Sequence, residues 1–164
     1  MRKSLLLLLL AVVSMSSFAQ FEKGTKYVGA SLTGLNISYS TGEKFGLGLA
    51  ANGGYFFADS WMATCKLEYN HQWMPAPAND INAVAIGAGA RYYFQCNGIF
   101  LGAGLQYRHA GPSADYLQVP LEVGYCYYLN QHVSIEPAIY FEPCLNKFSD
   151  GTKVGLKIGL GYYF

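Results

Sequence analysis

Apolar residues alternate with small or polar ones along residues 153–164, which read KVGLKIGLGYYF. Every even-numbered position is apolar, and the odd-numbered positions hold lysine, glycine and one tyrosine. A period of two is typical of a β-strand, whose successive side chains point to opposite faces. A helix of this sequence would spread its lysines and glycines around the whole circumference, and each glycine would cost it up to about 1 kcal/mol. The pattern therefore predicts a strand over 153–164.

The same alternation occurs in seven more segments, which are separated by turn-forming residues. In the first of them the apolar parity changes between Leu32 and Leu35, which predicts a β-bulge near Gly34. Pro120 and Pro137 fall inside predicted strands, where the missing N–H predicts a local bulge or a lost hydrogen bond. The sequence thus predicts an all-β, eight-stranded antiparallel up-and-down fold. The seven segments are 25–39, 44–57, 61–70, 84–94, 99–108, 117–127 and 133–142.

The N-terminal residues have the three zones of a secretory signal peptide. Arg2 and Lys3 form a basic start, residues 5–13 are apolar, and Ser17-Phe18-Ala19 fits a small-x-small cleavage site. The apolar run is shorter than the about 20 residues that a membrane-spanning helix needs. We therefore expect a cleaved signal peptide at 1–19 and a single β-barrel domain at 20–164.

The composition narrows the class of protein. Without residues 1–19 the chain has nine basic and ten acidic residues, so it offers no electrostatic basis for binding nucleic acid. Its charged content of 13% is about half of the roughly 25% usual in globular domains. A membrane-spanning strand needs only about 9 to 11 residues, and a closed barrel satisfies its own backbone hydrogen bonds. These features predict a transmembrane β-barrel.

The volume of the lumen decides which face points outward. Eight strands leave an interior just wide enough for side chains, and the branched and aromatic set would overfill it. We therefore expect the apolar set to face lipid and the small and charged set to face the lumen. The charged residues predicted in the lumen are Lys66, Glu68, Arg91, Arg108, Glu122, Glu136, Glu142, Lys153 and Lys157.

Five bases and four acids in a narrow lumen are expected to pair, because an unpaired buried charge costs several kcal/mol. This near balance predicts a lumen plugged by side chains. Counting residues outward from the turns places Arg91, Gly102 and Glu122 in one row, with room over the glycine for a bridge. The same counting places Glu142 opposite Lys153 near the outer rim.

Aromatic residues recur just before short turns and at the terminus. An up-and-down meander brings these blocks to one rim, where they form a belt at the membrane interface. Longer connections and a sparser belt of Tyr39, Phe45, Tyr69, Trp73, Tyr107 and Phe141 mark the other rim. We expect the short turns on the periplasmic side and the longer loops outside the cell. The predicted periplasmic belt is Tyr55, Phe57, Trp61, Tyr92, Phe94, Tyr125, Tyr127, Tyr162 and Phe164.

Few residues suggest chemistry. His132, Ser134 and Glu136 form one triad-like cluster, similar to the His-x-Ser pairing of lipid A deacylases. The predicted geometry opposes catalysis, because His132 falls in a turn on the periplasmic rim whereas Ser134 faces the lumen. His71 and His109 flank different loops and lack the ligand spacing of a metal site. We expect no catalytic residue, no metal and no cofactor.

The four cysteines permit disulfides in an exported protein. Cys65 is predicted to point to lipid and Cys144 to lie at the outer rim. Cys96 and Cys126 fall near the inner rim, and they are the one pair that could meet. Free thiols are the default expectation, and the disulfide state stays open.

The signal peptide, the alternating strands, the aromatic rims and the terminal Phe164 together resemble the small outer-membrane β-barrel family of the OmpA transmembrane-domain and OmpX type, often labelled porin-like. The resemblance covers 20–164. It implies a multi-pass barrel in the outer membrane of a Gram-negative bacterium, in contact with membrane lipid and lipopolysaccharide. An aromatic end such as Tyr162 to Phe164 looks like the signal that the barrel-assembly machinery reads.

Architecture of this type does not fix an activity. The leading interpretation is a monomeric, non-enzymatic barrel with a plugged lumen that serves envelope integrity or surface contact. A lipid A-modifying enzyme and a carrier for small apolar solutes are the alternatives.

Overall fold

The computed structural model describes residues 21–35, 46–72, 81–94, 97–111, 114–146 and 152–164. The regular structure within these ranges is all β. No helix of this part of the chain is long and apolar enough to cross a membrane. The strands are β1 (Lys26–Leu35), β2 (Gly46–Ala58), β3 (Trp61–Gln72), β4 (Ile81–Tyr93), β5 (Ile99–Ala110), β6 (Ala114–Gln118), β7 (Leu121–Tyr125), β8 (Tyr127–Tyr128), β9 (Val133–Glu142) and β10 (Lys153–Tyr163).

Some of the sequence predictions fall outside the described residues. These are the signal peptide at 1–19, Cys96, the aromatic residues Tyr39, Phe45 and Trp73, and most of the longer loops (40–43, 73–80, 112–113 and 147–151).

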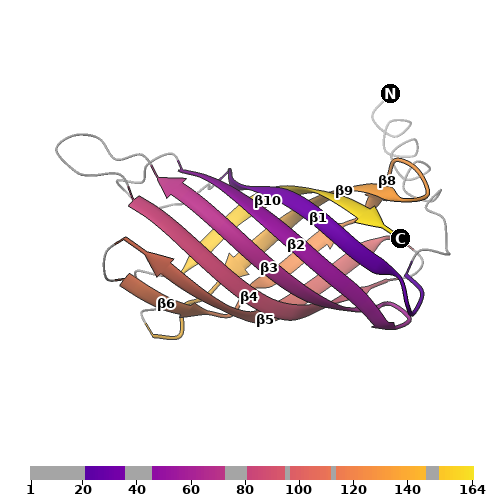
Figure 1. Cartoon of the computed structure of the whole chain (residues 1–164), viewed down its shortest axis with the longest axis horizontal. Helices are drawn as coiled ribbons and strands as arrows, with labels where there is room; N and C mark the ends of the chain where they lie inside the picture. The colour runs from indigo at the N-terminus through magenta and orange to yellow at the C-terminus, as the bar shows by residue number, and fades with distance from the viewer. Residues whose placement is uncertain (1–20, 36–45, 73–80, 95–96, 112–113, 147–151) are drawn as a thin grey trace, which may run out of the picture.

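The strands form one closed antiparallel barrel (Figure 1). Neighbours in sequence are neighbours in the sheet, and β10 closes the barrel by pairing with both β9 and β1. β6 and β7 pair with β5 in one register, and β7 and β8 pair with β9 in one register. These three short segments are therefore pieces of a single strand. The barrel has eight strands in the predicted up-and-down order.

The irregularities follow the predicted positions. The β1–β10 register shifts between Thr33 and Leu35, so the bulge expected near Gly34 is confirmed. The break between β6 and β7 falls at Val119 and Pro120, although the Gly104 N–H still donates to the Pro120 carbonyl over 3.0 Å. Pro120 thus interrupts the regular hydrogen-bond ladder with β5, but the two strands stay hydrogen-bonded at this point.

Pro137 lies within β9, which is continuous, and the interruption occurs in the strand that pairs with β9 on one side. Strand β9 runs through Pro137 and pairs with β10 without a shift, so the bulge, one of the two predicted alternatives, does not occur here. On its other side, the ladder skips from the Gly124–Ala138 pair to the Tyr127–Ile135 pair. The lost hydrogen bonding expected of this proline therefore falls between β7 and β8.

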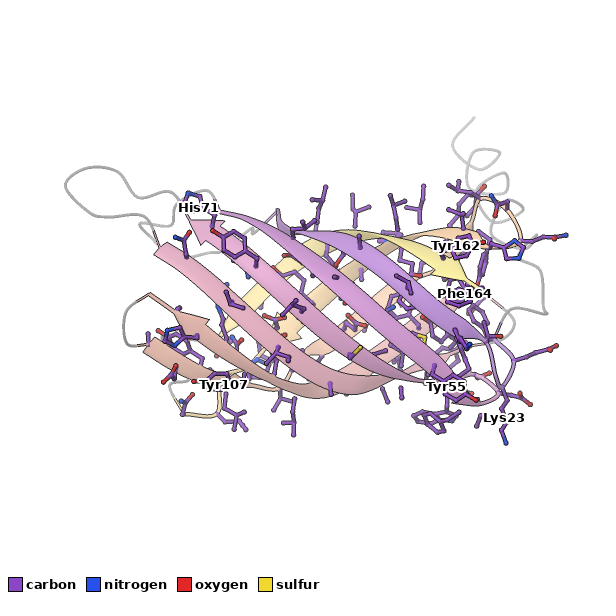
Figure 2. The ribbon with its side chains drawn as sticks, in the orientation of Figure 1. Lys23, Tyr55, His71, Tyr107, Tyr162 and Phe164 are labelled. Carbon is purple, nitrogen blue, oxygen red and sulfur yellow. The ribbon has the colours of Figure 1, made fainter. Side chains whose placement is uncertain are left out.

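Side chains alternate between the two faces as predicted. Large apolar residues such as Leu49, Ile86 and Leu160 are more than half exposed on the outer face. Charged residues such as Arg91 and Glu136 are buried in the lumen. Apolar side chains project away from the wall along the whole barrel (Figure 2). The barrel thus has an apolar outer face and a lumen that contains charged side chains, which is the reverse of a soluble barrel.

Candidate functional site: the barrel lumen

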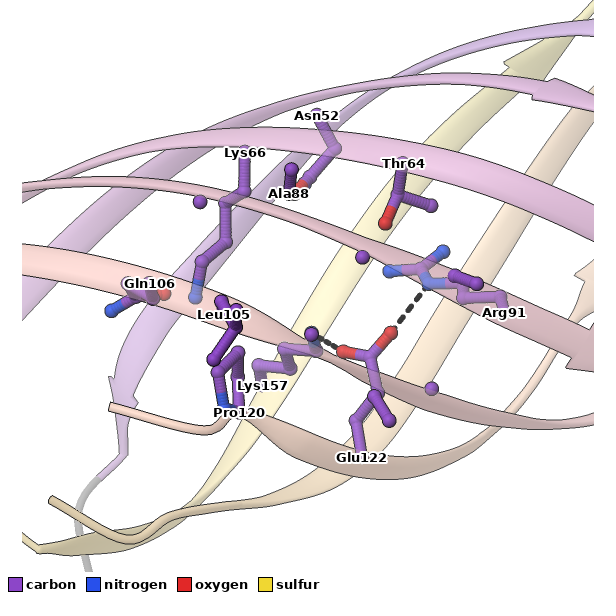
Figure 3. Close-up of a pocket in the computed structure, with 16 residues that line it drawn as sticks. Asn52, Thr64, Lys66, Ala88, Arg91, Leu105, Gln106, Pro120, Glu122 and Lys157 are labelled. Carbon is purple, nitrogen blue, oxygen red and sulfur yellow. Dashed lines mark hydrogen bonds and ion pairs between the residues drawn. The ribbon is translucent and has the colours of Figure 1, made fainter. Parts of the chain in front are cut away.

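A cluster of four charged side chains fills the middle of the lumen. Arg91 Nε donates to Glu122 Oε1 over 2.5 Å, and Arg91 Nη1 donates to Glu136 Oε2 over 3.0 Å. The Lys157 ammonium donates to the second oxygen of Glu122 (Figure 3). We call Arg91, Glu122, Glu136 and Lys157 the central ion cluster. It joins strands β4, β7, β9 and β10, so it ties opposite walls of the barrel together.

A glycine makes room for the shortest bridge of this cluster. Arg91 pairs with Gly102 across β4 and β5, and Gly102 pairs with Glu122 across β5 and β7. A Cβ atom at position 102 would come within 2.5 Å of the Glu122 side chain. The Arg91–Glu122 bridge predicted from strand register is present. It passes over Gly102, which has no side chain and lies between the two residues.

A second group of charges lies nearer the other rim. Lys66 Nζ is 2.9 Å from Glu68 Oε2 and 3.1 Å from Glu142 Oε1. Asn70 and Thr33 also donate to Glu68. We call Lys66, Glu68 and Glu142 the outer ion cluster. It connects β3 to β9 across the lumen.

The predicted partner of Glu142 occupies the predicted register position. Lys153 lies opposite Glu142 in the β9–β10 ladder. The cross-lumen contact of Glu142 with Lys66 did not follow from register counting, because such counting relates only neighbouring strands. Contacts across the lumen depend on the tilt and stagger of the whole barrel.

Arg108 differs from the other lumen bases. Its side chain is buried, and its Nε has no hydrogen-bond partner among the described residues. Gln106 Nε2 donates to Gln118 Oε1 over 3.3 Å, while the side-chain oxygen Oε1 of Gln106 is buried without a hydrogen-bond partner among the described residues. Hydrogen bonding is thus incomplete on this side of the lumen.

A partly open cavity of about 50 Å³ lies beside the central ion cluster (Figure 3). Gly87, Gly89, Gly102 and Gly104 form part of its wall on β4 and β5. The polar and charged side chains around it are Asn52, Thr64, Lys66, Arg91, Gln106, Glu122 and Lys157. Its volume is that of a few water molecules.

Aromatic side chains fill the lumen at the end of the barrel that carries Phe164. Phe21 stacks on Tyr93 with ring centroids 4.4 Å apart, and Phe56 and Tyr163 pack beside them. The Ser60 N–H donates to the Phe21 carbonyl over 2.8 Å, which fixes the residue ahead of β1. We call the buried cluster of Phe21, Tyr27, Phe56, Met62, Tyr93, Phe100, Cys126, Ala138 and Tyr163 the aromatic plug.

The sequence reasoning missed the aromatic plug. It described the lumen as narrow and filled by small and charged residues, and it assigned no aromatic cluster to the interior. Tyr27, Phe56, Tyr93 and Phe100 nevertheless occupy the inward parity of their strands, next to glycines. A Cβ atom at Gly124 would meet the Phe100 ring at 2.3 Å. Large inward residues paired with inward glycines were the signal that could have revealed the plug.

Glu136 joins the plug to the central ion cluster. Its Oε1 accepts hydrogen bonds from Ser134 Oγ and Tyr163 OH, both over 2.8 Å. Its Oε2 accepts from Tyr27 OH and from Arg91, both over 3.0 Å. A carboxylate with four donors is fully satisfied, so it is a structural anchor.

The triad-like cluster of the sequence is not assembled. The His132 ring stacks on the outward Tyr162 at a centroid distance of 5.7 Å. Ser134 is completely buried, and its hydroxyl donates to Glu136. The imidazole and the hydroxyl therefore lie on opposite sides of the wall.

The other candidate residues have local partners. His71 Nδ1 lies 2.7 Å from Asn82 Oδ1, and His109 Nδ1 lies 2.7 Å from Asp115 Oδ1. No group of three or more potential ligands within the described ranges could hold a metal ion. Cys65, Cys126 and Cys144 are free thiols, and Cys96, the partner considered for Cys126, lies outside the described residues. Cys65 is exposed, in agreement with its predicted lipid-facing position, and Cys144 is buried.

The aromatic residues predicted to form the inner belt point outward at one end of the barrel. Tyr55, Tyr162 and Phe164 lie there, and Tyr107 lies towards the other end (Figure 2). The rings contact one another around the wall: Trp61 and Tyr92 are 5.0 Å apart, and Tyr92 and Phe94 are 5.1 Å apart. The full set is Tyr55, Phe57, Trp61, Tyr92, Phe94, Tyr125, Tyr127, Tyr162 and Phe164, with Tyr92 and Tyr125 half-buried.

Solved structures with the same architecture come from several bacteria. The chain is similar to Neisserial surface protein A, with 21% identity over 87% of this chain and 100% of that chain and a TM-score of 0.68. It is similar to the N-terminal β-barrel domain of Pseudomonas aeruginosa OprF, with 15% identity over 87% and 98% of the two chains and a TM-score of 0.63. Ail of Yersinia pestis has 13% identity over 87% and 100%, with a TM-score of 0.60.

Sequence identities this low establish a common fold but no common activity or partner. Comparison with curated proteins gave no match. The family model of the outer membrane protein β-barrel domain, in contrast, matches residues 5–164. Because this match spans almost the whole sequence, the chain belongs to the outer membrane protein β-barrel domain family and is a protein of the Gram-negative outer membrane.

Proposed function

We propose that the protein is a non-enzymatic outer-membrane barrel that serves envelope integrity or surface contact and that conducts no solute. The observation that carries this proposal is the closure of the lumen by two successive barriers. The aromatic plug fills the end that carries Phe164, and the central ion cluster crosses the middle. The cavity beside the central ion cluster has a volume of about 50 Å³, which is that of a few water molecules.

Opening such a lumen is energetically costly. Breaking a buried ion pair by removing one partner typically costs about 3–5 kcal/mol, because the other charge is left uncompensated. Arg91, Glu122 and Lys157 share one network, so displacing any one of them breaks at least one buried ion pair. This favours a static wall over a gated pore.

The outer surface supports a role within the membrane. Exposed leucine, isoleucine and valine side chains cover the middle of the barrel, and aromatic side chains lie towards its ends. Such a surface matches a hydrocarbon layer bounded by two interfaces. Membrane lipid and lipopolysaccharide are the partners that we assign to it, with the Phe164 end on the periplasmic side.

The alternatives have weaker support. A lipid A-modifying enzyme needs a nucleophile and a base together beside the outer leaflet, and His132 and Ser134 are separated by the wall. A carrier for apolar solutes needs a lateral gap or an apolar tunnel through the wall, whereas the cavity next to the central ion cluster is lined by four charged side chains, Lys66, Arg91, Glu122 and Lys157. Two structural neighbours are named as a surface protein and as an attachment invasion locus protein, and these names favour surface contact.

A deletion strain tests the proposal. Loss of the protein should increase sensitivity to detergents or large antibiotics, or reduce attachment to surfaces, while the acylation pattern of lipid A stays unchanged. Wild-type protein and the His132→Ala variant should restore the phenotype equally. An altered lipid A pattern, or selective failure of His132→Ala, would favour the enzyme instead.

A further inference from the structure

A shallow apolar groove crosses the outer face of the barrel wall over strands β3, β4, β5, β7, β9 and β10. It lies between two adjacent rows of outward side chains, and each row follows the pairing of neighbouring strands. The groove therefore follows from the register of the sheet. The first row is Trp61, Tyr92, Leu101, Val123 and Ile139, and the second is Ala90, Ala103, Leu121, Phe141 and Val154.

The groove climbs from the Phe164 end of the barrel towards the other end. Trp61 begins β3 at the Phe164 end, whereas Val154 lies near the start of β10, at the end of that strand opposite to Tyr163. Neighbouring strands lie about 4.8 Å apart, so the steps from β3 to β10 give a length of about 24 Å. With a strand tilt of about 40°, these steps rise by about 15 Å, which is half of a hydrocarbon core of about 30 Å. The groove thus spans about one leaflet of a bilayer.

Small residues form the floor of the groove near the Phe164 end. Ala90 and Ala103 are paired neighbours there. Gly102, Glu122 and Tyr140 also line the groove although they have the inward parity, so it reaches down to the level of the strands. β4 and β5 stay paired on both sides of the two alanines. The groove is therefore a depression in the outer wall and not a gap through it.

The surroundings of the groove determine what fills it. The chain is an outer-membrane protein, so this face lies in the hydrocarbon of the bilayer. An empty groove would forfeit the dispersion contacts of its lining. A protein partner needs a broad complementary face of about 800 Å². The two rows are two residues apart along each strand, about 7 Å, which is room for a single hydrocarbon chain.

The groove starts in the aromatic belt. Trp61 and Tyr92 both line its end, and their ring centroids are 5.0 Å apart. Each ring carries a polar N–H or O–H on an apolar body, which suits the interface between hydrocarbon and head groups. The ester groups of a phospholipid lie at this depth. A phospholipid thus finds donors for its ester carbonyls and an apolar path for its chain in one place.

From the course of the groove, its width and the aromatic pair at its end, we infer that it binds one acyl chain of a phospholipid from the periplasmic leaflet, with the ester groups beside Trp61 and Tyr92. This inference deepens the membrane role proposed above and rests on the proposed orientation, with the Phe164 end on the periplasmic side. The lipid is a resident component of the barrel and not a transported solute. An acyl chain of lipopolysaccharide would enter at Phe141 and Val154, beyond the alanine floor.

Quenching by a brominated phospholipid tests the site. The chain has two tryptophans, so Trp73→Phe leaves Trp61, at the end of the groove, as the single fluorophore. In detergent micelles, a phospholipid with brominated acyl chains should quench Trp61 saturably, with a plateau near one lipid per barrel. Quenching that rises only linearly with lipid would contradict a specific site.

Two double variants in this background locate the site. Ala90→Leu with Ala103→Leu fills the floor of the groove and should remove the saturable quenching. Ala30→Leu with Ala51→Leu is the matched control, because these two exposed alanines are paired neighbours on β1 and β2, outside the groove. The control should keep the saturable quenching. An equal response of the two double variants would overturn the assignment.

Native mass spectrometry of protein extracted from outer membranes identifies the occupant. We expect one retained phospholipid per wild-type barrel, reduced several-fold when Ala90 and Ala103 are leucine. A retained lipid A species, or a dimer, that is lost in this variant would overturn the choice of a phospholipid. Wild-type protein without any retained lipid would overturn the proposal even if the variant does not fold. None of these results depends on whether the lumen is closed, which current recording tests separately.

Discussion

Arg91 and Glu122 lie on strands separated by β5, and their side chains meet at 2.5 Å over Gly102. Three residues in one register row thus form the bridge at the centre of the lumen: the base Arg91, the side-chain-free Gly102 and the acid Glu122. The bridge is buried, and it is extended by Lys157 and by Glu136 on other strands. Its position explains how a barrel with many small inward residues can still be closed.

Replacing Gly102 by a residue with a side chain should disturb the Arg91–Glu122 bridge. In Gly102→Ala the new Cβ would lie 2.5 Å from Glu122 Cγ, so the carboxylate must move away from Arg91. We expect the free energy of unfolding to fall by about 1–3 kcal/mol, as for other overpacked sites. Urea titration followed by tryptophan fluorescence measures it. Gly159→Ala is the matched control, because its Cβ would make only ordinary contacts, the nearest at 3.5 Å, and it should be nearly neutral.

A double-mutant cycle measures the strength of the pair. Arg91→Met and Glu122→Gln should each destabilise the barrel by about 3 kcal/mol, because each breaks the shortest buried ion pair of the central ion cluster and leaves the remaining charges unbalanced. The double variant should cost clearly less than the two single changes together. His109 and Asp115 form an exposed pair and serve for comparison, with an expected coupling of at most about 1 kcal/mol. Additive effects for Arg91 and Glu122 would mean that the bridge contributes little.

Phe21 should seal one end of the lumen. Phe21→Ala removes the ring that stacks on Tyr93 and leaves a void in the aromatic plug. We expect a loss of about 2–4 kcal/mol in unfolding free energy, near the low end for buried phenylalanine. Phe57→Ala, which truncates an exposed ring at the same end of the barrel, is the control. Equal losses in the two variants would indicate that Phe21 does not belong to the plug.

The terminal aromatic residue should matter for assembly. Phe164 is exposed on the outer wall beside Tyr162, at a ring distance of 5.9 Å. Phe164→Asp should lower the yield of folded barrel in the outer membrane, measured as the heat-modifiable band on gels. Leu145→Asp adds the same charge at another exposed apolar position and should insert normally. Normal yield of Phe164→Asp would remove the assembly role and leave the architecture intact.

Much of this architecture was predictable from the sequence, because it follows from local rules. Side-chain parity set the two faces, and turn positions set the register that brings Arg91 next to Glu122. The parity change near Gly34 indicated the bulge. Each of these features depends on one strand or on two neighbours.

The remaining features depend on the whole barrel. The contact of Lys66 with Glu142 joins β3 to β9, and strand-by-strand counting does not relate these strands. The aromatic plug depends on a lumen whose filling changes along its axis, with large rings at one end and long charged side chains in the middle. Phe21 precedes the first strand, so no periodicity marks its place in the plug.

Single-channel recording in planar bilayers tests the closure of the lumen most directly. Purified, refolded wild-type protein is added to the bilayer at a range of voltages, with detergent alone as the control. A lumen closed by the aromatic plug and the central ion cluster predicts a current indistinguishable from that of detergent alone. Reproducible discrete openings of the wild-type protein would contradict the account.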